Sequence, residues 1–227
     1  MGAYETLMAS AALDMPLQDN AASTVVVDNI GTDGSLAGGH NTEDIAATGP
    51  TAWFPSALHF DDSADYVDCS TVVLTGDFTA FWWANRDGKA GEVDAVFGYS
   101  SQTTSFIRFD QNEDRVAFRT QGGTLRTIET GVTTNGEWHS YALVKRSDNL
   151  LDLYVDGSLV TADNLGDAAS LTLNYIGKHA GNLFDGRLAG CALWTSALSD
   201  ADVAALHAGP VSGSSRRLPS TLMGVGP

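Results

Sequence analysis

The sequence WHSYALVKRSDNLLDLYV, residues 138–155, contains two short apolar runs separated by polar residues. The runs 138–145 and 150–155 are rich in aromatic and β-branched residues, which favour β-strands. Between them lies Ser-Asp-Asn at 147–149, a combination typical of tight turns. The segment therefore predicts two consecutive antiparallel strands joined by a short loop.

The same pattern recurs N-terminal to this segment. Runs of similar composition occupy residues 77–84, 104–109 and 115–120, and glycine-containing turns separate them. Strands spaced by roughly ten residues, with turns between them, are typical of a β-sandwich or barrel. No connection is long enough for a crossover helix, so the sheets should be mostly antiparallel.

Two segments have helical character. Residues 4–10 are expected to form a short leading turn. Ser199 has the side chain of an N-cap, Asp200 and Asp202 follow it in the first turn, and the Gly-Pro pair at 209–210 would end the helix. We therefore expect an all-β protein with one short C-terminal helix.

Composition limits the classes of partner. Of the 227 residues, 43% are hydrophobic and 18% charged, which indicates one folded domain with a large core, over residues 1–208. The 28 acidic residues outnumber the 12 basic ones, so nucleic acid and anionic membranes are improbable partners. No apolar run approaches the roughly 20 residues that span a bilayer. Cys69 and Cys191 are interpreted as two free thiols in preference to one disulfide.

The last 19 residues, GPVSGSSRRLPSTLMGVGP at 209–227, differ from the rest because they contain two arginines and no acid. They show no helix or strand period, and alone they are expected to be disordered. Our hypothesis is an extended basic tail that anchors the domain to a neighbouring copy or a particle. Its arginines would pair with acids, and its apolar side chains would fill a groove: Arg216, Arg217, Leu218, Leu222 and Met223.

Short motifs along the chain occur in a distinctive order. They are LDMPL (13–17), DNIGTDGSL (28–36), ALHFDD (57–62), DYV (65–67), FTAFWW (78–83), WH (138–139), LYVDG (153–157), IG (176–177), FDGRL (184–188), Trp194 and ALS (197–199). In order and spacing the chain resembles the laminin G-like jelly-roll domains of the concanavalin A-like lectin and glucanase superfamily, near its pentraxin branch. The resemblance covers roughly residues 8–208 and implies an antiparallel β-sandwich with about six or seven strands in each sheet.

The hydrolases of that superfamily carry three acids on one strand, in the pattern Glu-x-Asp-x-x-Glu. Here Glu92 and Asp94 match the first two positions, and Phe97 stands where the general acid would be. Retaining hydrolysis needs a close carboxyl pair, which this motif lacks. We therefore expect no enzymatic activity, and we interpret Glu92 and Asp94 as solvated residues beside a turn.

Calcium is the cofactor that the resemblance implies. The loops in which relatives bind the ion contain several aspartates, of which Asp28 and Asp62 are the candidate ligands. However, Ala189 occupies a position on the closing strand where many relatives have an acid. Aspartates also form turns in their own right, so the sequence leaves a calcium site open.

A glycan site would need aromatic rings and planar hydrogen-bond donors. Strand alternation places Arg108 on the face of Phe106, and Arg119 on the face of Arg115, away from their apolar neighbours. These arginines would suit a carboxylated or sulfated sugar, or alternatively they pair with Asp110, Glu113 and Asp114. The candidate ligand-binding residues are Arg108, Arg119, Tyr99, His179 and Asn182.

The leading interpretation is a non-catalytic, lectin-like module that binds a glycan or a protein surface. The alternative is a structural decoration, tail or adhesion protein of a phage virion or another extracellular particle. The N-terminus shows no secretory signal, and we expect the protein outside cells or on a virion surface. The fold alone does not separate these functions.

Overall fold

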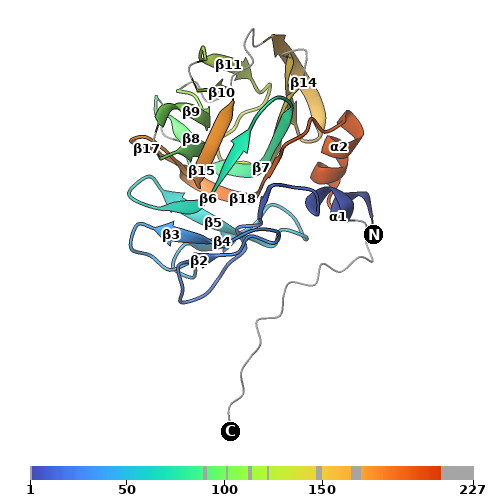
Figure 1. Ribbon diagram of the computed structural model, residues 1–227. Helices are drawn as coiled ribbons and strands as arrows, with labels where there is room; N and C mark the ends of the chain where they lie inside the picture. Colours follow the sequence, from blue (N-terminus) through green and yellow to red (C-terminus); the bar gives the residue numbers. More distant parts are fainter. Residues whose placement is uncertain are drawn as a thin grey trace.

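The structure, a computed structural model, describes residues 2–88, 91–100, 102–111, 114–121, 123–146, 150–164 and 170–210. For residues 102–104 and 161–164 it describes the backbone alone. Two antiparallel sheets pack face to face as a sandwich (Figure 1). Each sheet has eight strands, more than the six or seven that the resemblance implies, because short N-terminal strands join both sheets. The proposed anchor residues, 216–218, 222 and 223, lie outside the described residues.

Sheet A is built from strands in the order β14-β13-β12-β7-β18-β5-β4, and β1 pairs with residues 191–193 of β18. The bounds of these strands are Leu13–Met15 for β1, Ala46–Thr48 for β4, Ser56–Asp61 for β5, Phe78–Arg86 for β7, His139–Lys145 for β12, Leu150–Val155 for β13, Ser158–Asn164 for β14 and Asp185–Trp194 for β18. The strands predicted at 77–84, 138–145 and 150–155 are therefore confirmed as β7, β12 and β13.

Sheet B has the order β11-β10-β9-β8-β15-β6-β3-β2. Its strands are Val25–Val26 for β2, Gly34–Ala37 for β3, Tyr66–Leu74 for β6, Asp94–Tyr99 for β8, Gln102–Phe109 for β9, Arg115–Arg119 for β10, Arg126–Glu129 for β11 and Leu171–Ile176 for β15. A separate hairpin follows β15 and consists of β16, Lys178–His179, and β17, Asn182–Leu183.

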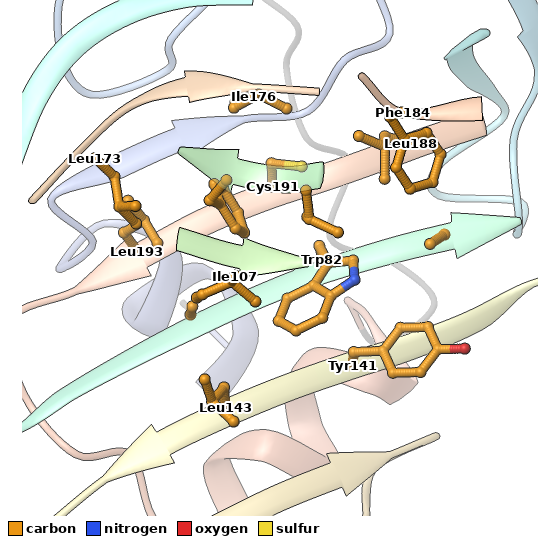
Figure 2. Close-up of a cluster of buried hydrophobic side chains, with 14 of the residues drawn as sticks. Trp82, Ile107, Tyr141, Leu143, Leu173, Ile176, Phe184, Leu188, Cys191 and Leu193 are labelled. Carbon is orange, nitrogen blue, oxygen red and sulfur yellow. The ribbon is translucent and has the colours of Figure 1, made fainter. Parts of the chain in front are cut away.

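The main core fills the space between the sheets. Trp82 of β7 stacks on Tyr141 of β12 at 5.4 Å between ring centroids, and it meets Phe97 of β8 edge-on at 6.0 Å. Figure 2 shows Trp82 among side chains from both sheets. Cys191 is buried in this core, Cys69 packs against it, and neither thiol forms a disulfide.

A second apolar cluster covers the outer face of sheet A. Trp83, which points away from Trp82, stacks on His207 at 5.3 Å between centroids. The cluster is completed by residues of α1, Ala3–Met8, and α2, Asp200–Ala208, which lie side by side on this face (Figure 1). Both predicted helical segments are therefore present, and both tryptophans are buried. None of the described helices is long and apolar enough to cross a bilayer.

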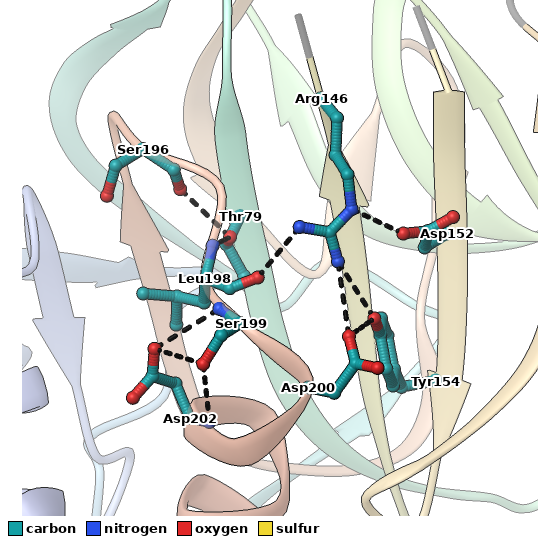
Figure 3. Close-up of polar contacts among 9 residues, drawn as sticks. All are labelled: Thr79, Arg146, Asp152, Tyr154, Ser196, Leu198, Ser199, Asp200 and Asp202. Atoms are coloured by element: carbon teal, nitrogen blue, oxygen red, sulfur yellow. Dashed lines mark hydrogen bonds and ion pairs between the residues drawn. The ribbon is translucent and has the colours of Figure 1, made fainter. Parts of the chain in front are cut away.

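Helix α2 is fixed at its first turn by its own sequence. Ser199 accepts a hydrogen bond from the Asp202 backbone N–H, and the Asp202 carboxylate accepts the Ser199 N–H, which forms a capping box. Asp200 accepts hydrogen bonds from Tyr154 of β13 and from Arg146, which follows β12, as Figure 3 shows. Burial, followed by the bond to Asp200, raises the pKa of Tyr154 to about 12, so its hydroxyl remains a donor at neutral pH.

Substitution of Ser199 should measure this cap. We expect Ser199→Ala to lower the free energy of unfolding by about 1 kcal/mol, because the Asp202 N–H loses its acceptor. The melting temperature should fall by about 2–4 °C for a chain of this size. Ser199→Thr, which keeps the hydroxyl, is the control; an equal fall for both variants in thermal unfolding would contradict the role of the cap.

Candidate functional site

The outer face of sheet B carries the charged candidates. Ile107 and Phe109 of β9 point into the core, so Phe106 and Arg108 point outward. On β10, Val116 and Phe118 belong to the core, which places Arg119 outward on the neighbouring strand. The two described helices, α1 and α2, both pack on sheet A. We therefore call the outer face of sheet B, which neither of them covers, the open face.

One guanidinium group lies over an aromatic ring of the open face, and a second arginine is the cross-strand neighbour of that ring. The Arg108 guanidinium lies over the Phe106 ring, 4.5 Å from its centroid, and Arg119 is the direct cross-strand partner of Phe106. Arg119 Nε donates to the Gly123 carbonyl at 2.9 Å. Phe106 itself is only 3% exposed, so its ring supports Arg108 and is not a free stacking surface.

Arg108 and Arg119 place two positive charges close together on the open face. Burial lowers the pKa of Arg108, and the nearby charge of Arg119 lowers it further while Asp110 opposes the shift. Within the described part of the chain neither arginine forms an ion pair with a carboxylate, and the buried Arg108 Nε has no hydrogen-bond partner. Arg115 pairs with Glu129 instead of the aspartates that the sequence offered, and Glu113 lies outside the described residues.

The remaining candidates surround this pair to different degrees. The His179 ring packs against Phe106 at 4.3 Å between centroids and is 3% exposed, so it supports the site from below the surface. Asn182 is half-buried and lies opposite His179 in the β16–β17 hairpin. Tyr99 is half-buried at the end of β8, and among the described residues no ring or polar contact joins it to the others.

Sequence reasoning missed a third cation on the same face. Lys178 Nζ lies 3.7 Å from the centroid of the Tyr66 ring and 5.3 Å from that of Tyr175. Tyr66 and Tyr175 flank the core residues Val67 and Ile176 in sequence, which places their rings outward. The sequence offered one signal for Lys178, which is that lysine is rare in this chain. Only three lysines occur, and Lys145 is buried against the Gly76 carbonyl.

The glycosidase-like motif has a structural role at Asp94. This side chain is 2% exposed and pairs with the buried Arg86, so the expectation that Asp94 is solvated was wrong. Glu92 is exposed, as expected, while Phe97 is part of the core. The sequence pattern missed the pair because Arg86 comes from the other sheet. The two acids are therefore in unlike environments, one held by a guanidinium and one in solvent.

Of the two calcium candidates, Asp28 has a carboxylate that already accepts hydrogen bonds from the backbone. Asp28 accepts hydrogen bonds from the backbone N–H groups of Asp14 and Ile30, at 3.2 and 3.1 Å. Asp62 occupies a left-handed turn, with φ of 58°, and its N–H donates to the Phe184 carbonyl. Across the described residues no three His, Cys, Asp or Glu side chains are grouped so that they could hold a metal ion. Calcium binding at Asp28 and Asp62 stays a prediction.

A pocket of about 550 Å³ beside these loops contains two histidines and three aspartates. His40 Nδ1 lies 3.0 Å from Asp65 Oδ1, and this hydrogen bond raises the pKa of His40. His59 Nε2 lies 2.8 Å from Asp87, which also accepts from Arg187. These polar groups are engaged in pairs, and they differ in this respect from the arginines of the open face.

Structural comparison finds the same fold in solved structures of botulinum neurotoxin binding domains. The chain is similar to the receptor binding domain of botulinum neurotoxin C/D mosaic serotype, with a TM-score of 0.63 and 11% identity over 88% of this chain and 51% of that one. It is also similar to the botulinum neurotoxin serotype D ligand binding domain in complex with N-acetylneuraminic acid, with a TM-score of 0.65 and 12% identity over 91% of this chain and 52% of that one. The chain thus spans about half the length of these neighbours.

A third similar structure is the binding domain of botulinum neurotoxin DC in complex with rat synaptotagmin II, with a TM-score of 0.58 and 13% identity over 88% of this chain and 52% of that one. No curated protein matches the sequence significantly. The sequence profile of a family described as the concanavalin A-like lectin/glucanases superfamily matches residues 61–204, which is more than half of the chain. The chain therefore belongs to the concanavalin A-like lectin/glucanases superfamily.

Proposed function

We propose that the protein is a non-catalytic recognition module that binds an acidic glycan on the open face of sheet B. The observation that carries this proposal is the pair formed by Arg108 and Arg119, which in the described part of the chain has no carboxylate partner. The pair occurs in a chain with a net charge of −16, where acids to neutralise it are abundant. Guanidinium groups bind carboxylates and sulfates through two parallel hydrogen bonds.

Membership of a lectin-containing superfamily supports this function. One structural neighbour was solved in complex with N-acetylneuraminic acid, a sugar that carries a carboxylate, and another in complex with rat synaptotagmin II. The neighbours are only 11–13% identical, so they support the fold and the class of module and no particular residue. The choice of an acidic glycan rests on the arginines of this chain.

The environments of two carboxylates, Glu92 and Asp94, support the proposal that the protein is not catalytic. Asp94 is bound to Arg86 inside the protein, and Phe97 of the same strand belongs to the core. Because the Asp94 carboxylate is engaged by Arg86, it is not available to act with the exposed Glu92 in retaining hydrolysis. On the open face the chemistry available is anion binding.

Calorimetric titration with acidic and neutral oligosaccharides tests the proposal. We expect a sulfated or uronic-acid oligosaccharide to bind and a neutral one of equal length to bind at least about tenfold more weakly. Arg108→Ala and Arg119→Ala should each weaken binding by roughly 10- to 100-fold, since a hydrogen bond to a charged group contributes about 1.5–3 kcal/mol. Raising the salt concentration should weaken binding of the wild type.

Arg115→Ala is the matched control. Arg115 lies on the same strand and the same face as Arg119 and is likewise half-buried, but it is already bound to Glu129. Its loss should change the affinity by less than about twofold. Equal effects of all three substitutions, or equal affinity for acidic and neutral sugars, would overturn the assignment of the arginine pair.

A further inference from the structure

A pocket of about 460 Å³ opens on the other side of the β16–β17 hairpin from the arginine pair. This size is in the range of small-ligand sites. Its lining combines one cation and one aromatic ring with small side chains that leave the space open: Lys178, Tyr66, Ala37, Gly38, Ala64 and Gly181. The pocket therefore offers a positive group in a recess wide enough for a sugar ring.

Lys178 is held in this pocket by aromatic rings. Its ammonium lies over Tyr66, which packs edge-on against Tyr175 with 5.0 Å between centroids. The rings fix the position of the charge, but they do not satisfy the three N–H donors of an ammonium group. In the described residues no carboxylate pairs with Lys178. Like Arg108, it is a cation supported by a ring and, among the described residues, not engaged in an ion pair.

The hairpin lies between this pocket and the arginine pair on the outer face of sheet B. Tyr175, Gly98 and Phe106 are aligned across three neighbouring strands by direct cross-strand pairing. The hairpin rests on Gly98, where a Cβ atom would lie 2.1 Å from the Lys178 carbonyl oxygen, so only glycine permits this contact. Lys178 then faces Tyr66 and the next residue, His179, faces Phe106.

The separation of the two cationic positions follows from the sheet. Phe106 is in β9 and Tyr66 in β6, and the strand order β9-β8-β15-β6 puts three strand spacings, about 14 Å, between them. Asn182, on the hairpin between the two positions, has a side-chain amide that can bond to hydroxyl groups. One sugar ring does not reach across this distance, whereas a chain of several rings does.

We propose that the Lys178 pocket is a second anion subsite and that the ligand is an extended glycan carrying at least two acidic groups. This inference rests on the proposed function, because the first acidic group occupies the arginine pair. The second subsite adds affinity only when one molecule is long enough to reach both positions, since the second contact is then intramolecular.

A length series of heparin-derived oligosaccharides, from disaccharide to octasaccharide, tests the second subsite. For the wild type we expect the affinity to rise by about tenfold or more between the disaccharide and the longer chains. Lys178→Gln should remove this rise and leave disaccharide binding unchanged, and Lys178→Arg should retain it. Arg108→Ala should weaken binding at every length.

Ala64→Trp is an independent variant, because Ala64 is exposed and lines the pocket, so the indole fills it while Lys178 is kept. It should abolish the dependence on length just as Lys178→Gln does. If both variants keep the wild-type dependence on length, the second subsite is refuted while the proposed function stands. If the wild type binds no acidic oligosaccharide of any length, the proposed function fails and this inference fails with it.

Discussion

Asp94→Asn is expected to lower the free energy of unfolding by about 3–5 kcal/mol, because it removes the carboxylate charge that faces the buried Arg86 guanidinium. Arg86 is 1% exposed, and its Nε donates to Asp94 Oδ2 at 2.5 Å. The same guanidinium donates to Thr134 Oγ1 at 2.9 Å and lies over the Phe109 ring. The Asp185 N–H donates to the other Asp94 oxygen, at 3.3 Å. The pair therefore joins β7, β8 and β18 across the two sheets.

Urea denaturation and thermal unfolding measure this effect. A loss of this size corresponds to a fall in melting temperature of roughly 6–20 °C for a chain of about this length. Arg86→Met combined with Asp94→Leu is the control, because replacing both charges with apolar side chains removes the guanidinium together with its carboxylate. The double variant should recover most of the lost stability. A cost below about 1 kcal/mol for Asp94→Asn would show that the pair is not needed for folding.

This ion pair also shows why the strands could be predicted from the sequence, whereas the buried polar contacts could not. Strand alternation and turn residues are local signals, and they located β7, β12 and β13 and the cap of α2 at Ser199. Asp94 is buried because a side chain from the opposite sheet meets it, and no local pattern contains that information. The prediction that Asp94 is solvated failed for this reason.

The open face was partly predictable by the same logic. Arg108 and Arg119 were assigned to one face because alternation alone fixes the direction of a strand side chain. Lys178 was missed, since its position depends on how the β16–β17 hairpin folds back over Gly98. A glycine in the middle of an apolar strand signals a close approach of backbone, but it does not identify what approaches.

The other large effect is expected in the main core, where Trp82→Ala should lower the free energy of unfolding by about 3–5 kcal/mol. The Trp82 side chain is completely buried and contacts rings of both sheets: Tyr141 in sheet A, and Phe97 and Phe109 in sheet B. Removal of the indole leaves a cavity that two packed sheets cannot close. Chemical denaturation measures the loss.

Trp82→Phe separates the cavity from the polar atom of the indole. Among the described residues Trp82 Nε1 has no hydrogen-bond partner, so phenylalanine keeps an aromatic ring and removes a buried unpaired N–H. It should cost about 1 kcal/mol, well below the alanine variant.

Phe109, which touches Trp82, alternates with Arg108 on β9, so the core and the proposed site occupy opposite faces of one strand. Below its melting temperature Trp82→Ala should therefore bind acidic oligosaccharide within about twofold of the wild type, and a larger loss would show that the arginine pair depends on the packing beneath it.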